Sequence, residues 1–322
     1  MGFAGRLRGG LLTMAAVLGP VAASGPTLAA DPPAASAPAD SAGAPPTTVS
    51  GIEVVAPSRM KAKPSRPAVN TFVGSLGVTT LAGQLATWSR TALPGLSTTP
   101  DAQAADALAG QTICPIVLGL PAANADFILA RIRKVGTALG APMSKTACPR
   151  DANNVAIVFP DDAAAFVRDL ASDKPQAFGF RYHGELVRDR VRPLEPVRAW
   201  YGVRTVVTEM KDSRLSLNHQ SVIFQVLIVV DRDKTEAINM GQLSDYLAMI
   251  SLADIQPEKV PRAAPSILNM FNDIAAHRTP PEGMTRMDAA YLQALYDIGP
   301  RQPGERQNEQ IAERILTALA GK

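Results

Sequence analysis

The segment from Ser221 to Val230 (SVIFQVLIVV) is an almost uninterrupted apolar run. Such runs are typical of strands that are buried on both faces, whereas a half-exposed strand alternates apolar and polar residues. Val197 to Val207 shows this alternation, and the residues on one face are Val197, Ala199, Tyr201, Val203 and Val207. The sequence therefore predicts a central, buried strand at 221–230 and a second strand at 197–207.

Helical periodicity is clearest from Ala122 to Leu139, where Ile128, Ile132 and Val135 recur at intervals of three or four residues. Asparagine or threonine followed three residues later by Gln or Asp favours a helix start. Further elements are expected as a strand at Asn154–Phe159, a helix after Asp161 and Asp162, helices opened by Asn239 with Gln242 and by Thr285 with Asp288, and a last helix from Pro303. This order predicts an α+β fold with a small mixed sheet, packed helices and a helical C-terminus.

The first 30 residues have the three parts of a secretory signal peptide. Arg6 and Arg8 precede an apolar run from Leu11 to Ala23, and small residues lead to Asp31. The run is shorter than the ~20 residues that a membrane span needs. We therefore expect removal of residues 1–30, export to the periplasm or outside the cell, and no membrane span in the mature protein.

Residues 31–67 are rich in Pro and Ala, and no aromatic residue lies between Phe3 and Phe72. A segment of this composition buries too little apolar surface to offset its ordering entropy, so it is expected to be a disordered tether. One short strand is possible at Ile52–Ala56. Residues 68–322 are expected to form a single domain, with a flexible surface loop near 91–112.

Cys114 and Cys148 are the only cysteines. In an oxidising compartment an even pair usually forms a disulfide, so we predict a Cys114–Cys148 bond.

The mature protein, without the signal peptide, would carry a net charge of +1. A protein this close to neutral lacks the basic surface that nucleic-acid binding requires. The sequence indicates no cofactor.

Familiar catalytic patterns are absent from the sequence. It contains neither a Gly-rich phosphate loop nor a GxSxG nucleophile motif, and its three histidines, His183, His219 and His277, are far apart. No helix can therefore present two imidazoles one turn apart, as the HExxH metal motif requires. We expect neither a catalytic residue nor a metal ligand to be recognisable by motif.

Several short segments resemble an uncharacterised family of exported alphaproteobacterial proteins. They include Ile113-Cys114-Pro115, Gly119-Leu120-Pro121, Cys148-Pro149, Arg198-Ala199-Trp200-Tyr201 and Asp245-Tyr246-Leu247-Ala248-Met249. The resemblance extends from about Val69 to the C-terminus and implies no known activity.

The C-terminal third also resembles the second half of a metzincin-type metalloprotease domain. In that family a central strand precedes the zinc helix HExxHxxGxxH, and an S-I-M turn and a helix of the form T-x-x-D…L-Y follow. The matching segments here are Val222–Val230, Gly241–Met249, Ser266-Ile267-Leu268-Asn269, Thr285-Arg286-Met287-Asp288 and Ala294-Leu295-Tyr296. The resemblance implies a zincin-like fold.

Every catalytic position of that frame has changed in this chain. Gly241 and Asp245 occupy the two histidine positions, Gln242 that of the catalytic glutamate, and Ser251 that of the third ligand. Glycine offers no ligand, and Gln cannot take a proton from a zinc-bound water. The resemblance therefore implies a degenerate site, as in a pseudoenzyme.

Two classes of function remain open. The first is a non-catalytic binding scaffold whose partner is a protein, a peptide or another component of the cell envelope. The second is a cryptic, metallopeptidase-like hydrolase that uses carboxylates such as Asp245 and Asp288 with a histidine from elsewhere. A cleft with convergent titratable side chains would favour the second.

Overall fold

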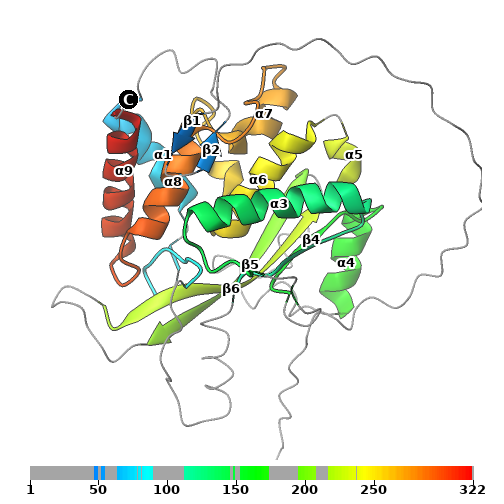
Figure 1. Ribbon diagram of the computed structural model, residues 1–322, viewed down its shortest axis with the longest axis horizontal. Coiled ribbons are helices and arrows are strands. Elements are labelled where there is room, and N and C mark those ends of the chain that lie inside the picture. Colours follow the sequence, from blue (N-terminus) through cyan, green and yellow to red (C-terminus); the bar gives the residue numbers. More distant parts are fainter. Residues whose placement is uncertain are drawn as a thin grey trace, which may run out of the picture.

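A four-stranded mixed sheet lies at the centre of the molecule (Figure 1). Its order is β3-β4-β6-β5, with β3, β4 and β6 parallel and β5 antiparallel to β6. The computed structural model describes residues 47–49, 52–54, 64–77, 79–80, 82–89, 112–145, 148, 153–173, 195–207, 217–236 and 238–320. The predicted signal peptide, and the predicted loop apart from Thr112, lie outside the described residues.

The strands are β3 (Pro115–Leu118), β4 (Val155–Val158), β5 (Val197–Val207) and β6 (His219–Val230). The helices are α1 (Arg66–Leu76), α3 (Ala122–Ala138), α4 (Ala163–Asp173), α5 (Arg232–Thr235), α6 (Met240–Leu252), α7 (Met270–Ala275), α8 (Arg286–Asp297) and α9 (Gly304–Ala320), with 3₁₀ turns η5 (Pro257–Lys259) and η6 (Ile267–Asn269). This mixed sheet with packed helices and a helical C-terminus confirms the predicted α+β class.

Strand β6 is the predicted central strand. It pairs with β4 on one side and β5 on the other, and Val226–Val230 are all buried. A bulge interrupts its pairing with β5, because Gly202 faces Gln225 while Val203 faces Ile223. The extra residue, Phe224, is left without a cross-strand partner. Such a bulge bends the strand and reverses the side-chain alternation beyond it.

Helix α3 connects β3 to β4, as expected for parallel neighbours that need a crossover. It packs against β3 and, along much of its length, against α6. Ile128, Ile132 and Val135 are buried, so the predicted periodicity marks the inward face. Asp162 accepts a hydrogen bond from the backbone N–H of Ala165 at 2.8 Å at the start of α4, where the sequence placed a helix N-terminus.

Helices α1, α8 and α9 form a second layer beside the sheet (Figure 1), in which α9 packs against both α1 and α8. The ring of Phe72 on α1 meets that of Tyr291 on α8 edge-on, with centroids 6.0 Å apart. Helix α1 lies almost wholly within the domain predicted from residue 68, but no helix was predicted there. Ser65 and Pro67 mark its start: the Ser65 side chain caps the helix and Pro67 lies in its first turn.

The structure corrects the predicted tether at 31–67 in two places. Strands β1 (Thr47–Val49) and β2 (Ile52–Val54) form an antiparallel hairpin, and α1 already begins at Arg66. Beta-branched residues favour extended, paired backbone, and this part of the tether is rich in them. The hairpin includes the short strand that was expected at Ile52–Ala56.

None of the helices in the described ranges is both long and apolar enough to cross a membrane.

Candidate functional site

Helix α6 carries all four residues that stand at the catalytic positions of the resembled family. Gly241, Gln242 and Asp245 lie in its first two turns, and Ser251 lies near its end. Its residues from Leu243 to Leu252 are all buried, so the helix is covered on every side rather than along one stripe. Helices α3 and α8 and the turn η6 pack around it. Leu243, Tyr246, Leu247 and Ile250, which recur at helical spacing, are all buried.

Gly241 and Gln242 are half-buried at the start of α6. The Asn239 side chain caps the helix by accepting a hydrogen bond from the Gly241 N–H at 2.7 Å. The predicted cap pair is wrong in its second half, because Gln242 donates from Nε2 to the Pro281 carbonyl at 2.5 Å instead of folding back onto Asn239. Gln242 therefore anchors the segment that leads into α8.

Asp245 lies one turn after Gly241 and is held from two sides. Its Oδ1 accepts a hydrogen bond from Nε of Arg131 on α3, and its Oδ2 accepts one from the Met284 N–H at 2.6 Å. The side chains of Arg131 and Asp245 are only 15% and 5% exposed. The carboxylate thus ties α3, α6 and the segment before α8 together.

Ser251 does not join the other three positions. Helix α6 continues through it to Leu252, and at 100° per residue Ser251 lies about 240° around the helix axis from Asp245. Its side chain is fully buried, and its Oγ has no hydrogen-bond partner within the described part of the chain. The structure therefore brings Gly241 and Asp245 to one helix face and leaves Ser251 on another.

The last carbonyls of α6 accept hydrogen bonds from three aromatic side chains. Tyr201 on β5 donates to the Ile250 carbonyl at 2.7 Å, the Trp88 indole donates to that of Ser251 at 3.0 Å, and Tyr296 on α8 donates to that of Leu252 at 2.9 Å. The final carbonyls of a helix have no partner within the helix, so buried ends need such donors. The predicted strand at 197–207 placed Tyr201 on one face, but no local sequence pattern predicted the hydrogen bonds of these three side chains to α6.

Asp288 occupies the N3 position of α8 and completes the predicted capping box with Thr285. Its Oδ2 accepts hydrogen bonds from the N–H of Thr285 at 3.0 Å and the N–H of Ile267 at 2.8 Å, and its Oδ1 accepts one from the Ser266 hydroxyl at 2.5 Å. Burial raises the pKa of Asp288 to about 6, although these donors act in the opposite direction. The side chain fastens the turn η6 to the start of α8.

The dispersed histidines do not converge on these carboxylates within the described residues. His219 begins β6 and lies beside the Asn218 side chain, with 3.0 Å between Nδ1 and Oδ1, while His277 is exposed just after α7; His183 lies outside the described ranges. Among the residues that the structure describes, no three His, Cys, Asp or Glu side chains are grouped closely enough to hold a metal ion.

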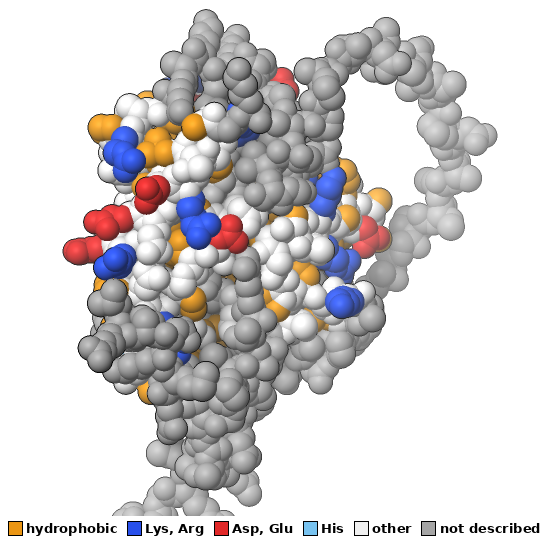
Figure 2. Space-filling view, turned by 60° about the vertical axis from the view of Figure 1, so that its left-hand side comes forward, with side chains coloured by type: hydrophobic (Ala, Val, Ile, Leu, Met, Phe, Trp, Pro, Cys, Tyr) orange, Lys and Arg blue, Asp and Glu red, His pale blue; other side chains and the backbone are white. Residues whose placement is uncertain are grey.

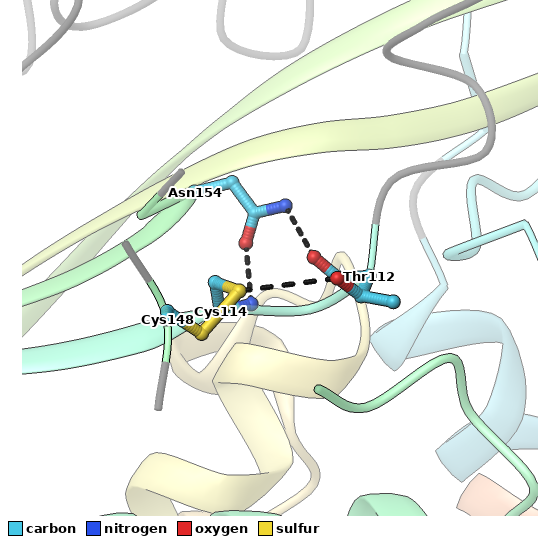
Figure 3. The surroundings of a disulfide bond; sticks show 4 residues. All are labelled: Thr112, Cys114, Cys148 and Asn154. Atoms are coloured by element: carbon cyan, nitrogen blue, oxygen red, sulfur yellow. Dashed lines mark hydrogen bonds between the residues drawn. A yellow bond between two sulfur atoms is a disulfide. The ribbon is translucent and has the colours of Figure 1, made fainter. Parts of the chain in front are cut away.

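Cys114 and Cys148 form the predicted disulfide, with 5.8 Å between their Cα atoms (Figure 3). The bond joins the start of β3 to the segment before β4. Next to it the Asn154 side chain accepts from the Cys114 N–H at 2.8 Å and donates to the Thr112 carbonyl at 3.1 Å. These contacts fix the ends of two parallel strands, which indicates a structural role for the bond.

A groove of about 620 Å³ lies between α8 and α9. Its lining combines small residues (Ala290, Ala294, Gly299 and Ala318) and Ile298 with the polar side chains Gln293, Asp297, Gln302, Gln310, Glu313, Arg314 and Thr317. Gln293 donates from Nε2 to Asp297 at 2.9 Å, while its Oε1 is buried without a partner in the described part of the chain. The lining can therefore both donate and accept hydrogen bonds.

Comparison of the chain with models of known protein families, with curated proteins and with solved structures found no match.

Proposed function

We propose that this protein is an exported, non-catalytic binding protein of the periplasm or extracellular space, built on a degenerate zincin-like scaffold. The observation that carries the proposal is the state of Asp245. It stands at a histidine position of the resembled zinc helix, yet its two oxygens are engaged by Arg131 and by the Met284 N–H. A carboxylate held in this way serves to join elements rather than to meet a substrate.

The arrangement after β6 supports the zincin-like part of the proposal. The central strand leads into α6, the turn at Ser266 and Ile267 follows, and α8 begins with Thr285 and Asp288. This is the order of the resembled family. Asp288 also joins the turn to the helix directly, so these segments form one spatial unit as well as a sequence pattern.

The hydrolase alternative has less support, because both carboxylates that it would use have internal partners. Asp245 is engaged as described, and Asp288 accepts hydrogen bonds from Ser266, Ile267 and Thr285 while fully buried. General acid–base catalysis requires a group within hydrogen-bond reach of the substrate. Neither carboxylate offers such access in this arrangement.

The groove between α8 and α9 is the binding surface that we assign to this function. Its amide and carboxylate side chains, which share the lining with small residues, suit an extended peptide or an envelope polymer rich in hydroxyl and amide groups. On the face that Figure 2 shows, Lys and Arg side chains are interleaved with Asp and Glu, so no single charge dominates it. Recognition would therefore depend on hydrogen bonds rather than on net charge.

A matched pair of variants tests this assignment. Thr317→Arg places a long charged side chain in the groove, whereas Thr137→Arg makes the same change at an exposed position on α3. Crosslinking of the tagged, exported protein in intact cells should capture a partner with wild type and Thr137→Arg but not with Thr317→Arg. Equal capture by all three proteins would remove the groove from the proposal.

Elemental analysis of the purified mature protein tests the non-catalytic part separately. We expect no stoichiometric zinc and no cleavage of unstructured peptides. One zinc per chain that survives dialysis and is lost when His183, His219 or His277 is replaced would contradict the proposal and favour a metallohydrolase.

A further inference from the structure

The hairpin β1–β2 is separate from the central sheet and lies against two helices instead. Both of its strands contact α8, and β2 also contacts α3 (Figure 1). These two helices flank α6, since each of them packs against it. The hairpin therefore spans from one flanking helix to the other on the surface of the domain.

A two-stranded hairpin of this size is marginally stable by itself in water. Within the described residues, three pairs join its strands, from Thr47 opposite Val54 to Val49 opposite Ile52. Its order thus depends on the surface that α3 and α8 provide. The structure therefore holds a short β-hairpin seated on a helical surface, which is the arrangement of a docked ligand.

We propose that the surface formed by α3 and α8 is a docking site for short β-hairpin or extended peptides, and that β1–β2 is its occupant in cis. Residues 55–65 connect the hairpin to α1, a connection of 11 residues. A covalent connection makes binding of the hairpin an intramolecular event, so the hairpin has an effective concentration at this surface that a free partner lacks. A partner of similar chemistry must therefore compete with a segment that the chain itself supplies.

This inference goes beyond the proposed function, because it concerns a different surface from the groove between α8 and α9 and names its occupant. Either assignment can fail without the other. The docking site is tested with a defined probe, so no physiological partner needs to be known. The probe is a fluorescent synthetic peptide of residues 45–56 (PPTTVSGIEVVA), with a scrambled peptide of the same composition as its control.

The test uses the full mature chain with the hairpin disrupted. Val49→Pro with Ile52→Pro removes the backbone donors of a directly opposed, hydrogen-bonded pair, and proline is not accommodated at such positions of a ladder. Ala35→Pro with Ala39→Pro introduces the same residue twice outside the hairpin and is the matched control. Near-ultraviolet circular dichroism establishes that each variant retains its folded core.

The disrupted variant should bind the peptide saturably, at least tenfold more tightly than wild type or the matched control, and should not bind the scrambled peptide. Amide hydrogen exchange in α3 and α8 should be faster in the disrupted variant and return toward wild type when peptide is added. Equal binding by the folded variant and wild type, or no binding by either, would overturn the proposal. Protection of α3 and α8 that rises with protein concentration would instead show exchange of hairpins between two copies, and would overturn occupancy in cis.

Discussion

The guanidinium of Arg131 on α3 and the carboxylate of Asp245 on α6 form a buried ion pair between the two helices. The carboxylate also accepts the Met284 N–H, so a single side chain connects three segments that are distant in sequence. Removal of one partner from such a pair is costly because the remaining charge stays in a poorly solvated place.

Asp245→Ala should therefore lower the free energy of unfolding by about 3–5 kcal/mol. The combined variant Arg131→Met with Asp245→Ala should be more stable than Asp245→Ala alone, since it also removes the guanidinium that lost the Asp245 carboxylate. Urea denaturation of wild type, Asp245→Ala and the combined variant measures these free energies of unfolding.

Asp161→Ala is the matched control for the buried pair. Asp161 also pairs with an arginine, Arg232, but its side chain is 98% exposed, so its loss should change the stability by no more than about 1 kcal/mol. If Arg131→Met does not improve the stability of Asp245→Ala, the two charges are not coupled as described here.

Asp288 should make the protein less stable as the pH rises from about 4 to about 6. Burial raises its pKa from 3.8 to about 6, so the folded state binds the proton more tightly than the unfolded state. The stabilisation by the protonated carboxyl is complete below the unfolded pKa and is lost as the pH rises through the folded pKa. A difference of about two pH units corresponds to about 3 kcal/mol.

Stability curves at several pH values, for wild type and Asp288→Asn, measure this effect. The difference in stability between the two proteins should change by about 3 kcal/mol between pH 4 and pH 7 and be constant above that. Asp161→Asn, an exposed change of the same kind, should follow wild type. A wild-type minus Asp288→Asn difference that does not vary with pH would contradict the predicted pKa.

The sequence predicted best the elements whose signal is local. The apolar run at 221–230, the periodicity at 122–139 and the Thr285–Asp288 capping box each depend on neighbouring residues, and each proved correct. The disulfide also followed from composition, because the chain has only two cysteines.

The candidate site was less predictable because its contacts join residues far apart in the chain. Nothing near Asp245 in sequence indicates Arg131, which lies more than 100 residues earlier. Similarly, Gln242 has the spacing of a capping residue but finds the Pro281 carbonyl within reach. Spacing predicts which groups are available, whereas tertiary packing decides which of several possible partners each group meets.

Gly202 and Gly74 should respond in opposite ways to alanine. A Cβ at Gly202 would lie 2.8 Å from the Phe224 ring. The Arg204 guanidinium also contacts this ring, 5.3 Å from its centroid. A Cβ at Gly74 on α1 would meet nothing within 4 Å. Gly202→Ala should destabilise by about 1–3 kcal/mol. Gly74→Ala should stabilise by about 0.5–1 kcal/mol, as expected within an exposed helix. Thermal unfolding of the two variants tests this, and a neutral Gly202→Ala would show that the ring moves freely.

Loss of the disulfide should destabilise the fold without changing its architecture. The bond closes a loop of 34 residues, which corresponds to about 3–4 kcal/mol in the chain-entropy model. Cys114→Ala with Cys148→Ala should lose this amount in urea denaturation, and wild type under reducing conditions should match it. Identical stability of oxidised and reduced wild type would contradict the prediction.

The aromatic donors at the end of α6 should each be important for stability. Tyr201→Phe leaves the Ile250 carbonyl without its donor, and Tyr296→Phe does the same for the Leu252 carbonyl. A buried polar group without its partner costs about 1–3 kcal/mol, so each variant should lose about that much in urea denaturation.

Tyr246→Phe is the control for these losses, because it removes a phenol hydroxyl from α6 itself, whereas the carbonyls at the end of that helix take their hydrogen bonds from Tyr201, Trp88 and Tyr296. It should change the stability by less than about 0.5 kcal/mol. Because the two donors act on different carbonyls of one helix end, the double variant should lose no less than the larger single loss. If Tyr201→Phe and Tyr296→Phe are both as stable as Tyr246→Phe, water replaces the phenols and the end of α6 is more accessible than its burial indicates.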